Sequence, residues 1–349
     1  MKPLHITAFL NIYEEKGDYE IMAEKEKKTT RQNSVHIVGY LKENNLEVVK
    51  TEKGNAIRGS LLIATNDANS HKVQFYTYAK TKNGDDSQDY AALEALLPSQ
   101  TTSIASFLKD NPGSTFEIAA NASTKIWVMA RFEEYASKVG ERTKTMVTLK
   151  GFKAGVKNAT DASPFVPKAE FVVDIFIKDI KPEIINETEE EGSGEETGRY
   201  IVGALLPMYD ESVQYVDFIA PVEGGVAQYL SANFTKNDTL AIKGEIISMV
   251  TKVLKGGVEN ESDFFGEAPE PQYETTFTRE RLIKGLSRKP IKQGEEGCIS
   301  LEFVQNGMVK RETKMIENGK RMKEKDSEEK KPATSAPEEP KNFASDIDF

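Results

Sequence analysis

Tyrosine and lysine side chains share one face of the segment Lys72–Lys80, which alternates polar and apolar residues like a half-buried strand. Tyr76 and Tyr78 have the same parity as Lys72 and Lys80, whereas the opposite parity is apolar. Aromatic rings stack on nucleotide bases, and lysine or arginine side chains neutralise phosphates. The chemistry that this face offers is the binding of single-stranded nucleic acid.

The single tryptophan has a similar setting on the predicted strand Ser123–Phe132, where Trp127 shares a face with Lys125 and Arg131. Polar faces of two further strands extend this surface. An alternative explanation for each aromatic ring is a second small core, for example at a domain interface. The predicted nucleic-acid-binding residues of the N-terminal half are Tyr40, Arg58, Lys72, Tyr76, Tyr78, Lys80, Lys125, Trp127 and Arg131.

Short strands dominate the pattern of the whole chain, because β-branched and aromatic residues recur between turn signals. The predicted strands are Val35–Lys42, Ile57–Thr65, Lys72–Lys80, Ser123–Phe132, Thr145–Phe152, Glu170–Ile180, Tyr200–Tyr209, Val213–Ala220, Thr239–Val250 and Thr275–Lys284. The predicted helices are few and short: Tyr90–Leu97, Ser103–Lys109 and Val226–Phe234. The chain is therefore expected to be mostly β.

The two halves of the chain repeat the same order of elements. The string at Ile57–Leu62 resembles that at Ile201–Leu206, and strands opening Val-Gln-aromatic follow at Val73 and Val213. In each half three strands precede a helix-like segment, and two strands follow it. The first of these two strands is predicted at Thr115–Val128 in one half and at Asp238–Val250 in the other. This order is that of the OB-fold, a five-stranded Greek-key barrel. Chance similarity of short apolar strings is the alternative, and the agreement of order and motif favours duplication.

The predicted organisation is therefore two tandem OB-fold domains, at residues 35–160 and 168–292, after an N-terminal extension of residues 1–34 whose role stays open. The second domain contains an acidic loop at 187–198. Its binding face is harder to assign, and the outward cations predicted there are Lys243, Arg279 and Arg281.

The formal net charge of -10 does not exclude a polyanionic partner, because the acidity is local. Residues 1–160 hold 22 Lys/Arg against 19 Asp/Glu, whereas residues 161–200 hold 4 against 11. Two basic windows, Lys125–Lys157 and Arg279–Lys292, run against the average. Each window is also compatible with an ordinary solvated face.

Several classes of protein are excluded by what the sequence lacks. No apolar run is long enough to cross a membrane, and no signal peptide is evident, so we expect a cytoplasmic protein. One cysteine, Cys298, forms no internal disulfide, and three histidines leave little for a metal site. Phosphate-loop, zinc-protease and nucleophile-elbow motifs are absent. We therefore expect no enzyme activity, no cofactor and no metal.

The C-terminal part changes character twice. A β-hairpin is predicted at 296–318 around Asn306-Gly307, a dipeptide that suits a tight hairpin turn. Residues 320–349 lose apolar content and are predicted to be a disordered acidic tail. The last residues then place apolar anchors between carboxylates, in Phe343-Ala344-Ser345-Asp346-Ile347-Asp348-Phe349.

The ending Asp346-Ile347-Asp348-Phe349 resembles the acidic tip of bacterial and phage single-stranded DNA-binding proteins, in which an aspartate-rich run closes with Ile-Pro-Phe. Asp348 stands where that family has proline, and the aspartate run is thin. Because this chain has two expected OB-folds, the nearest likeness is a phage-encoded member, which would act in the host cytoplasm. The resemblance implies that Phe343, Asp346, Ile347, Asp348 and Phe349 bind replication, recombination or repair proteins.

The expected function is sequence-independent binding and protection of single-stranded DNA during replication, recombination or repair, with partners recruited through the tip. RNA in place of DNA and the oligomeric state stay open. The alternative is a β-rich virion or scaffolding protein that binds no nucleic acid. A salt series with oligo-dT separates these two, because counterion release makes nucleic-acid binding steeply salt-dependent.

Overall fold

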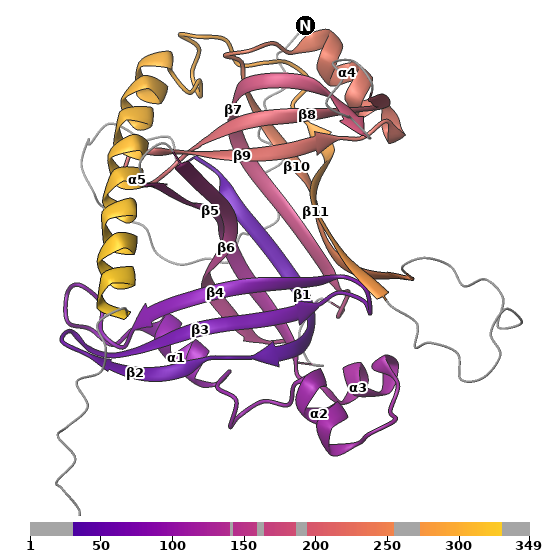
Figure 1. Ribbon diagram of the computed structural model, residues 1–349, viewed down its shortest axis with the longest axis vertical. Helices are drawn as coiled ribbons and strands as arrows, with labels where there is room; N and C mark the ends of the chain where they lie inside the picture. The colour runs from indigo at the N-terminus through magenta and orange to yellow at the C-terminus, as the bar shows by residue number, and fades with distance from the viewer. Residues whose placement is uncertain (1–30, 140–141, 159–163, 186–193, 255–272, 330–349) are drawn as a thin grey trace, which may run out of the picture. The chain divides into compact units, whose positions relative to one another are not determined.

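The computed structural model describes residues 31–139, 142–158, 164–185, 194–254 and 273–329. Its strands form one 11-stranded sheet that closes into two rings (Figure 1). The strands of the first ring and its edge are β1 Asn33–Asn44, β2 Glu47–Thr51, β3 Gly54–Ala64, β4 Ser70–Tyr78, β5 Lys125–Val139 and β6 Arg142–Val156. The second ring contains β7 Lys168–Ile185, β8 Glu195–Pro207, β9 Val213–Ala220, β10 Thr239–Leu254 and β11 Tyr273–Leu286.

The first ring is a closed barrel. β1 pairs with β3 and β5, β3 pairs with β4, β5 pairs with β6, and β4 closes the ring by a parallel pairing with β6. The helices α1 Gln88–Glu94, α2 Ile104–Asp110 and α3 Phe116–Ala122 lie between β4 and β5 in the chain. We call this ring barrel 1.

The second ring repeats the same cycle. β7 pairs with β8 and β10, β8 pairs with β9, β10 pairs with β11, and β9 closes the ring by a parallel pairing with β11. A short 3-10 turn, Glu223–Gly225, and α4 Val226–Asn233 lie between β9 and β10. We call this ring barrel 2. It joins barrel 1 through the antiparallel pairing of β1 with β7, in which Val35 faces Phe171.

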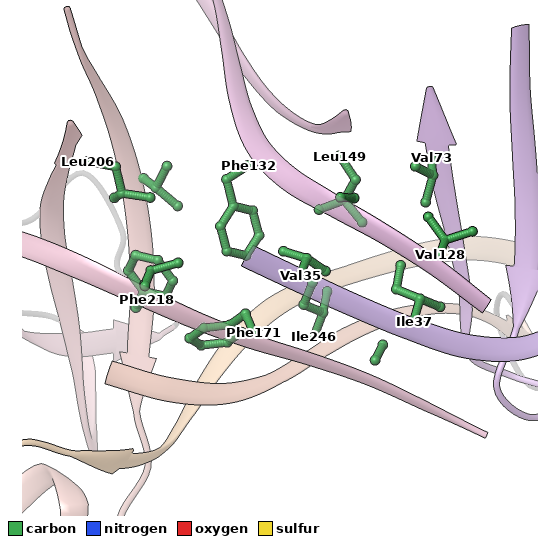
Figure 2. Packing of buried hydrophobic residues seen from close by; sticks show 14 of the residues in the cluster. Val35, Ile37, Val73, Val128, Phe132, Leu149, Phe171, Leu206, Phe218 and Ile246 are labelled. Atoms are coloured by element: carbon green, nitrogen blue, oxygen red, sulfur yellow. The ribbon is translucent and has the colours of Figure 1, made fainter. Parts of the chain in front are cut away.

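One hydrophobic core runs through both barrels. Phe132 of β5, Phe171 of β7 and Phe218 of β9 meet at its centre, with ring centroids 5.2–5.8 Å apart (Figure 2). Each ring is almost completely buried. The two barrels therefore share one hydrophobic core and do not have two independent cores.

The predicted strands and the three predicted helices are confirmed, and the mostly β class with them. The short strand β2 was not predicted. The strand predicted at Thr115–Val128 is wrong in its first half, where α3 lies. Thr115 caps this helix by accepting a hydrogen bond from the backbone of Ile118, and alanines follow it.

The predicted hairpin at 296–318 is wrong, because α5 Leu301–Glu329 occupies this part of the chain. Asn306 and Gly307 lie inside the helix. A Cβ on Gly307 would come 2.8 Å from a methyl carbon of Val213, so glycine serves here for close approach to β9 and not for a turn. The helix also covers the first ten residues of the predicted disordered tail, 320–329, while 330–349 lie outside the described residues.

The acidic loop predicted at 187–198 begins outside the described residues, and its end is not a loop. β8 starts at Glu195, whose backbone position pairs with Ile185 of β7. Glu195 and Glu196 are exposed there. The N-terminal extension predicted at 1–34 likewise overlaps β1, which starts at Asn33, and residues 1–30 lie outside the described residues.

Candidate nucleic-acid interface

The tyrosine pair lies on the outer face of barrel 1, as strand parity predicts. β4 turns His71, Val73 and Phe75 inward and leaves Tyr76 42% exposed, with Tyr78 half-buried beside it. The two ring centroids are 5.3 Å apart at 76°, and the Tyr76 hydroxyl donates to the Tyr78 hydroxyl at 3.5 Å. This hydrogen bond raises the pKa of Tyr76 above its ordinary value, so the ring is uncharged at neutral pH. An uncharged exposed ring suits base stacking.

Two cations flank the tyrosine pair, and each is held by an exposed carboxylate. Arg58 of β3 stands opposite Tyr76 in the antiparallel register and contacts Glu47 at 2.7 Å. Lys80 contacts Asp86, also at 2.7 Å. More than half of each of these side chains is exposed, and exposed ion pairs are worth little. A phosphate can therefore replace the carboxylate at small cost.

Polar side chains continue from β4 across β6 to β5. Gln74 neighbours Lys150 of β6, and Lys150 stands opposite Arg131 of β5. Phe152 and Lys153 of β6 are exposed farther along the same strand. These three β6 residues are not among the predicted binding residues, although Lys150 and Lys153 fall in the basic window Lys125–Lys157. Parity along Thr145–Phe152 could have placed Lys150 and Phe152 on one face, whereas Lys153 follows a register shift in the β5–β6 pairing.

Trp127 points outward but belongs to another part of the barrel wall. It stands opposite Gly155 of β6 and Val38 of β1, two strands away from β4 around the ring. A Cβ on Gly155 would come 2.9 Å from the indole Nε1, so the ring lies flat over this glycine and is half-buried. Trp127 therefore stays a predicted binding residue on the outer face of β5, the strand that also carries Arg131.

Tyr40 belongs to a second small core, the alternative that the sequence left open, and its assignment to a binding surface is corrected. Its ring packs edge-on against Phe165 at 5.0 Å and against the cluster formed by α2, α3 and Ala64 of β3. Lys125 contacts the same phenylalanine, with its Nζ 5.0 Å from the centre of the Phe165 ring.

Arg281 is not an outward cation, and that prediction is wrong. Its guanidinium lies 5.5 Å from the centre of the buried Phe132 ring and donates to the backbone oxygen of Asp217 at 3.1 Å. Burial lowers the pKa of Arg281 from its ordinary value. Arg279 and Lys243 are exposed on β11 and β10, but they lie on barrel 2, away from the tyrosine pair.

Metal sites, membrane spans and the C-terminal tip are the other features on which the sequence makes a prediction. Within them, no group of three or more His, Cys, Asp or Glu side chains could hold a metal ion. No helix in the same part of the chain has the length and apolar character of a membrane span. The five predicted tip residues, Phe343, Asp346, Ile347, Asp348 and Phe349, lie outside the described residues.

The chain is thus a protein of two joined β-barrels, with exposed tyrosine and arginine side chains on the outer face of the first. A family model described as YorF matches residues 31–321, which include both barrels and most of α5. The chain belongs to the YorF family. No curated protein matches the sequence.

Solved structures with detectable similarity are distant. The wild-type single-stranded DNA binding protein from Thermus aquaticus is 14% identical, with a TM-score of 0.40 over 77% of this chain and 98% of that chain. A deletion mutant of the same protein is 13% identical, with a TM-score of 0.42 over 76% and 98%. A chain of a replication protein A heterotrimer bound to single-stranded DNA is 11% identical, with a TM-score of 0.18 over 66% of this chain and 47% of that chain. TM-scores this low have no bearing on what this chain binds.

Proposed function

We propose that this protein binds single-stranded DNA without sequence preference, through the outer face of barrel 1 on β3, β4 and β6. The observation that carries the proposal is the exposed Tyr76 and Tyr78 pair, with Arg58 opposite it in register. Unpaired bases stack on the rings, and the cations beside them meet phosphates. This chemistry tolerates any sequence, because every base has a π-face.

We also propose that both barrels are OB-folds. The support is the cycle of pairings, which is the same in both, with a parallel closing pair and helices between the third and fourth strands of each ring. OB-folds bind oligonucleotides on the second and third strands, which in barrel 1 are β3 and β4. The tyrosine pair lies on those strands.

The exposed cations determine how binding responds to salt. Lys72 and Arg58 are exposed on β4 and β3, and Lys150 of β6 is half-buried beside them. Each contact of these cations with a phosphate releases a counterion. For single strands, the logarithm of the binding constant falls with the logarithm of salt concentration by about 0.7 per phosphate contact. Affinity should therefore drop steeply between low and physiological salt.

A role in replication, recombination or repair, with partners recruited by the tip residues 343–349, is the finer part of the proposal. It rests on the resemblance of Asp346-Ile347-Asp348-Phe349 to the tip of single-stranded DNA-binding proteins. Action in the host cytoplasm belongs to the same proposal.

Replacing Tyr76 with alanine tests the site. We expect the affinity for oligo-dT to fall about tenfold to a hundredfold, because one stacked base is lost. The salt dependence should stay unchanged, because no phosphate contact is removed. Fluorescence anisotropy with labelled oligo-dT over a salt series measures both quantities.

Tyr209→Ala is the matched control, since Tyr209 is 98% exposed on the turn between β8 and β9. Its affinity should equal that of the unchanged protein. Equal losses in both variants would remove Tyr76 from the site. Failure of the unchanged protein to bind oligo-dT at low salt would refute the function and favour the virion or scaffolding alternative.

Glu47→Gln tests the competition between carboxylate and phosphate for Arg58. Removing the charge of Glu47 leaves Arg58 available to phosphate, so affinity should rise severalfold at low salt, and less at high salt where charges are screened. The same anisotropy titration measures this. Glu52→Gln changes an exposed charge on the nearby turn and serves as control; an equal rise there would show a general charge effect and contradict a specific pair.

A further inference from the structure

We propose that α5 occupies, on barrel 2, the surface that single-stranded DNA uses on barrel 1, so that each chain has one nucleic-acid-binding barrel. This inference rests on the proposed function. β8 and β9 hold the positions in the second ring that β3 and β4 hold in the first. The outer face of β8 and β9 is therefore the surface on barrel 2 that corresponds to the tyrosine and arginine face.

The chain that leads into α5 and its first turn cover this outer face with apolar side chains. Ile299 and Val304 are buried against Leu205 of β8 and Val213 of β9. Tyr215 of β9 packs at the edge of the same cluster. These contacts exclude water and any ligand from the area that a base would need.

Ion pairs fix the next turns of α5. Arg311 donates to both carboxylate oxygens of Glu134, at 2.8 and 2.6 Å, and the Glu134 side chain is only 2% exposed. Lys310 contacts Glu211 at 2.6 Å, and Lys314 contacts Asp210, on the turn between β8 and β9. A buried bidentate pair is costly to break from one side, so α5 is firmly held.

The far part of the helix presses on β5. A Cβ on Gly319 would come 1.9 Å from the backbone oxygen of Lys138, so the two backbones meet at a distance that only glycine allows. The Asn318 side-chain amide donates to the backbone oxygen of Ala136 at 2.9 Å. These two contacts, like the Arg311–Glu134 pair, hold α5 against β5 of barrel 1. The apolar contacts of Ile299 and Val304 and the ion pairs to the β8–β9 turn are what hold its first part over barrel 2.

Close side-chain contacts also fill the outer face of β8 and β9 around Gly203. The Tyr215 hydroxyl and a carboxylate oxygen of Asp179 both lie over Gly203, where an added Cβ would come 2.6 and 2.4 Å from them. Burial, followed by a hydrogen bond to Asp217, raises the pKa of Tyr215. Lys178 lies 4.4 Å from the centre of the Tyr215 ring, where it is engaged with the tyrosine. These contacts leave little room for a stacked base beside Tyr215.

Lysine footprinting on the full chain tests the inference. The protein is acetylated with and without saturating oligo-dT, and each lysine is quantified by mass spectrometry. We expect Lys72 and Lys150 of barrel 1 to lose reactivity severalfold. Lys178 and Lys310 at the α5 face should react equally in both samples. Protection of Lys178 or Lys310 would overturn the inference, even if barrel 1 is protected as well.

A matched pair of charge reversals gives an independent measurement. Lys72 and Lys178 are both exposed strand residues, one on each barrel. Lys72→Glu should weaken oligo-dT binding about tenfold or more and reduce its salt dependence, whereas Lys178→Glu should leave both within twofold. Equal losses would contradict a single binding barrel. If the unchanged protein does not bind oligo-dT at all, the proposed function is refuted, and this inference with it. That outcome is distinct from equal losses in the two variants.

Discussion

Phe171→Ala is expected to lower the free energy of unfolding by about 3–5 kcal/mol and to destabilise both barrels together. Phe171 is 1% exposed, and its ring packs against both Phe132 of barrel 1 and Phe218 of barrel 2, which also contact each other (Figure 2). Removing the ring leaves a cavity at the place where β1 and β7 join the barrels. Because the core is continuous, the loss cannot be confined to one ring of strands.

Urea unfolding followed by two probes checks this expectation. Far-ultraviolet circular dichroism reports all strands, whereas fluorescence of the single tryptophan, Trp127, reports barrel 1. The two curves should coincide and shift together to lower urea. Phe152→Ala is the matched control on an exposed phenylalanine of β6, and it should cost less than about 1 kcal/mol. Separate transitions, with the fluorescence curve unmoved by Phe171→Ala, would contradict a shared core.

Strand positions could be predicted from the sequence because alternation of polar and apolar residues is a local property. The same alternation placed Tyr76 and Tyr78 on the outer face. It did not place Tyr40, whose polar parity is correct but whose ring is covered by Phe165 and by α2 and α3. Cover by a segment distant in the chain leaves no trace in the period of a strand.

The repeat was recognised in its order of elements but not in its register. Leu61 and Leu206 point into the shared core, whereas Leu205 belongs to the cluster under α5. The matched strings at Ile57–Leu62 and Ile201–Leu206 pair Leu61 with Leu205, so they align opposite faces of equivalent strands. A shift of one residue reverses every side chain in a strand, and sequence similarity of short apolar strings does not detect it.

Two predictions were wrong because they depend on contacts between segments that are distant in the chain. Arg281 was expected outside, but its guanidinium lies over Phe132 of the other barrel. Asn306-Gly307 was interpreted as a turn, but it lies in a helix whose buried positions Val304, Met315 and Gly319 face the barrels. The spacing of those apolar residues is helical, so α5 was detectable, whereas its docking on barrel 2 was not.

Acid is expected to destabilise the protein through His71. This side chain is 1% exposed inside barrel 1, and within the described residues neither ring nitrogen has a hydrogen-bond partner. Burial lowers the pKa of His71 from 6.5 to about 4. The unfolded chain therefore takes up a proton at His71 below pH 6.5, whereas the folded protein takes it up only below about pH 4.

The sign and the size of the change in stability with pH follow from this difference between the two pKa values. Between pH 6.5 and about 4 the unfolded state binds the extra proton, so stability is complete above pH 6.5 and falls as the pH drops through this window. The gap corresponds to about 3 kcal/mol, which is a large part of the stability of an ordinary domain. Below about pH 4 the folded state is protonated too, and His71 adds no further loss.

His71→Leu isolates the contribution of this residue, because leucine fills a similar volume and does not titrate. Urea unfolding at several pH values from 7 to 4 measures the free energy of unfolding for both proteins. We expect the unchanged protein to lose about 3 kcal/mol more over this range than His71→Leu. His36, whose pKa burial also lowers, is present in both proteins and cancels in the comparison. Parallel pH profiles would show that His71 reaches water or a partner in the folded protein and would contradict the buried neutral imidazole.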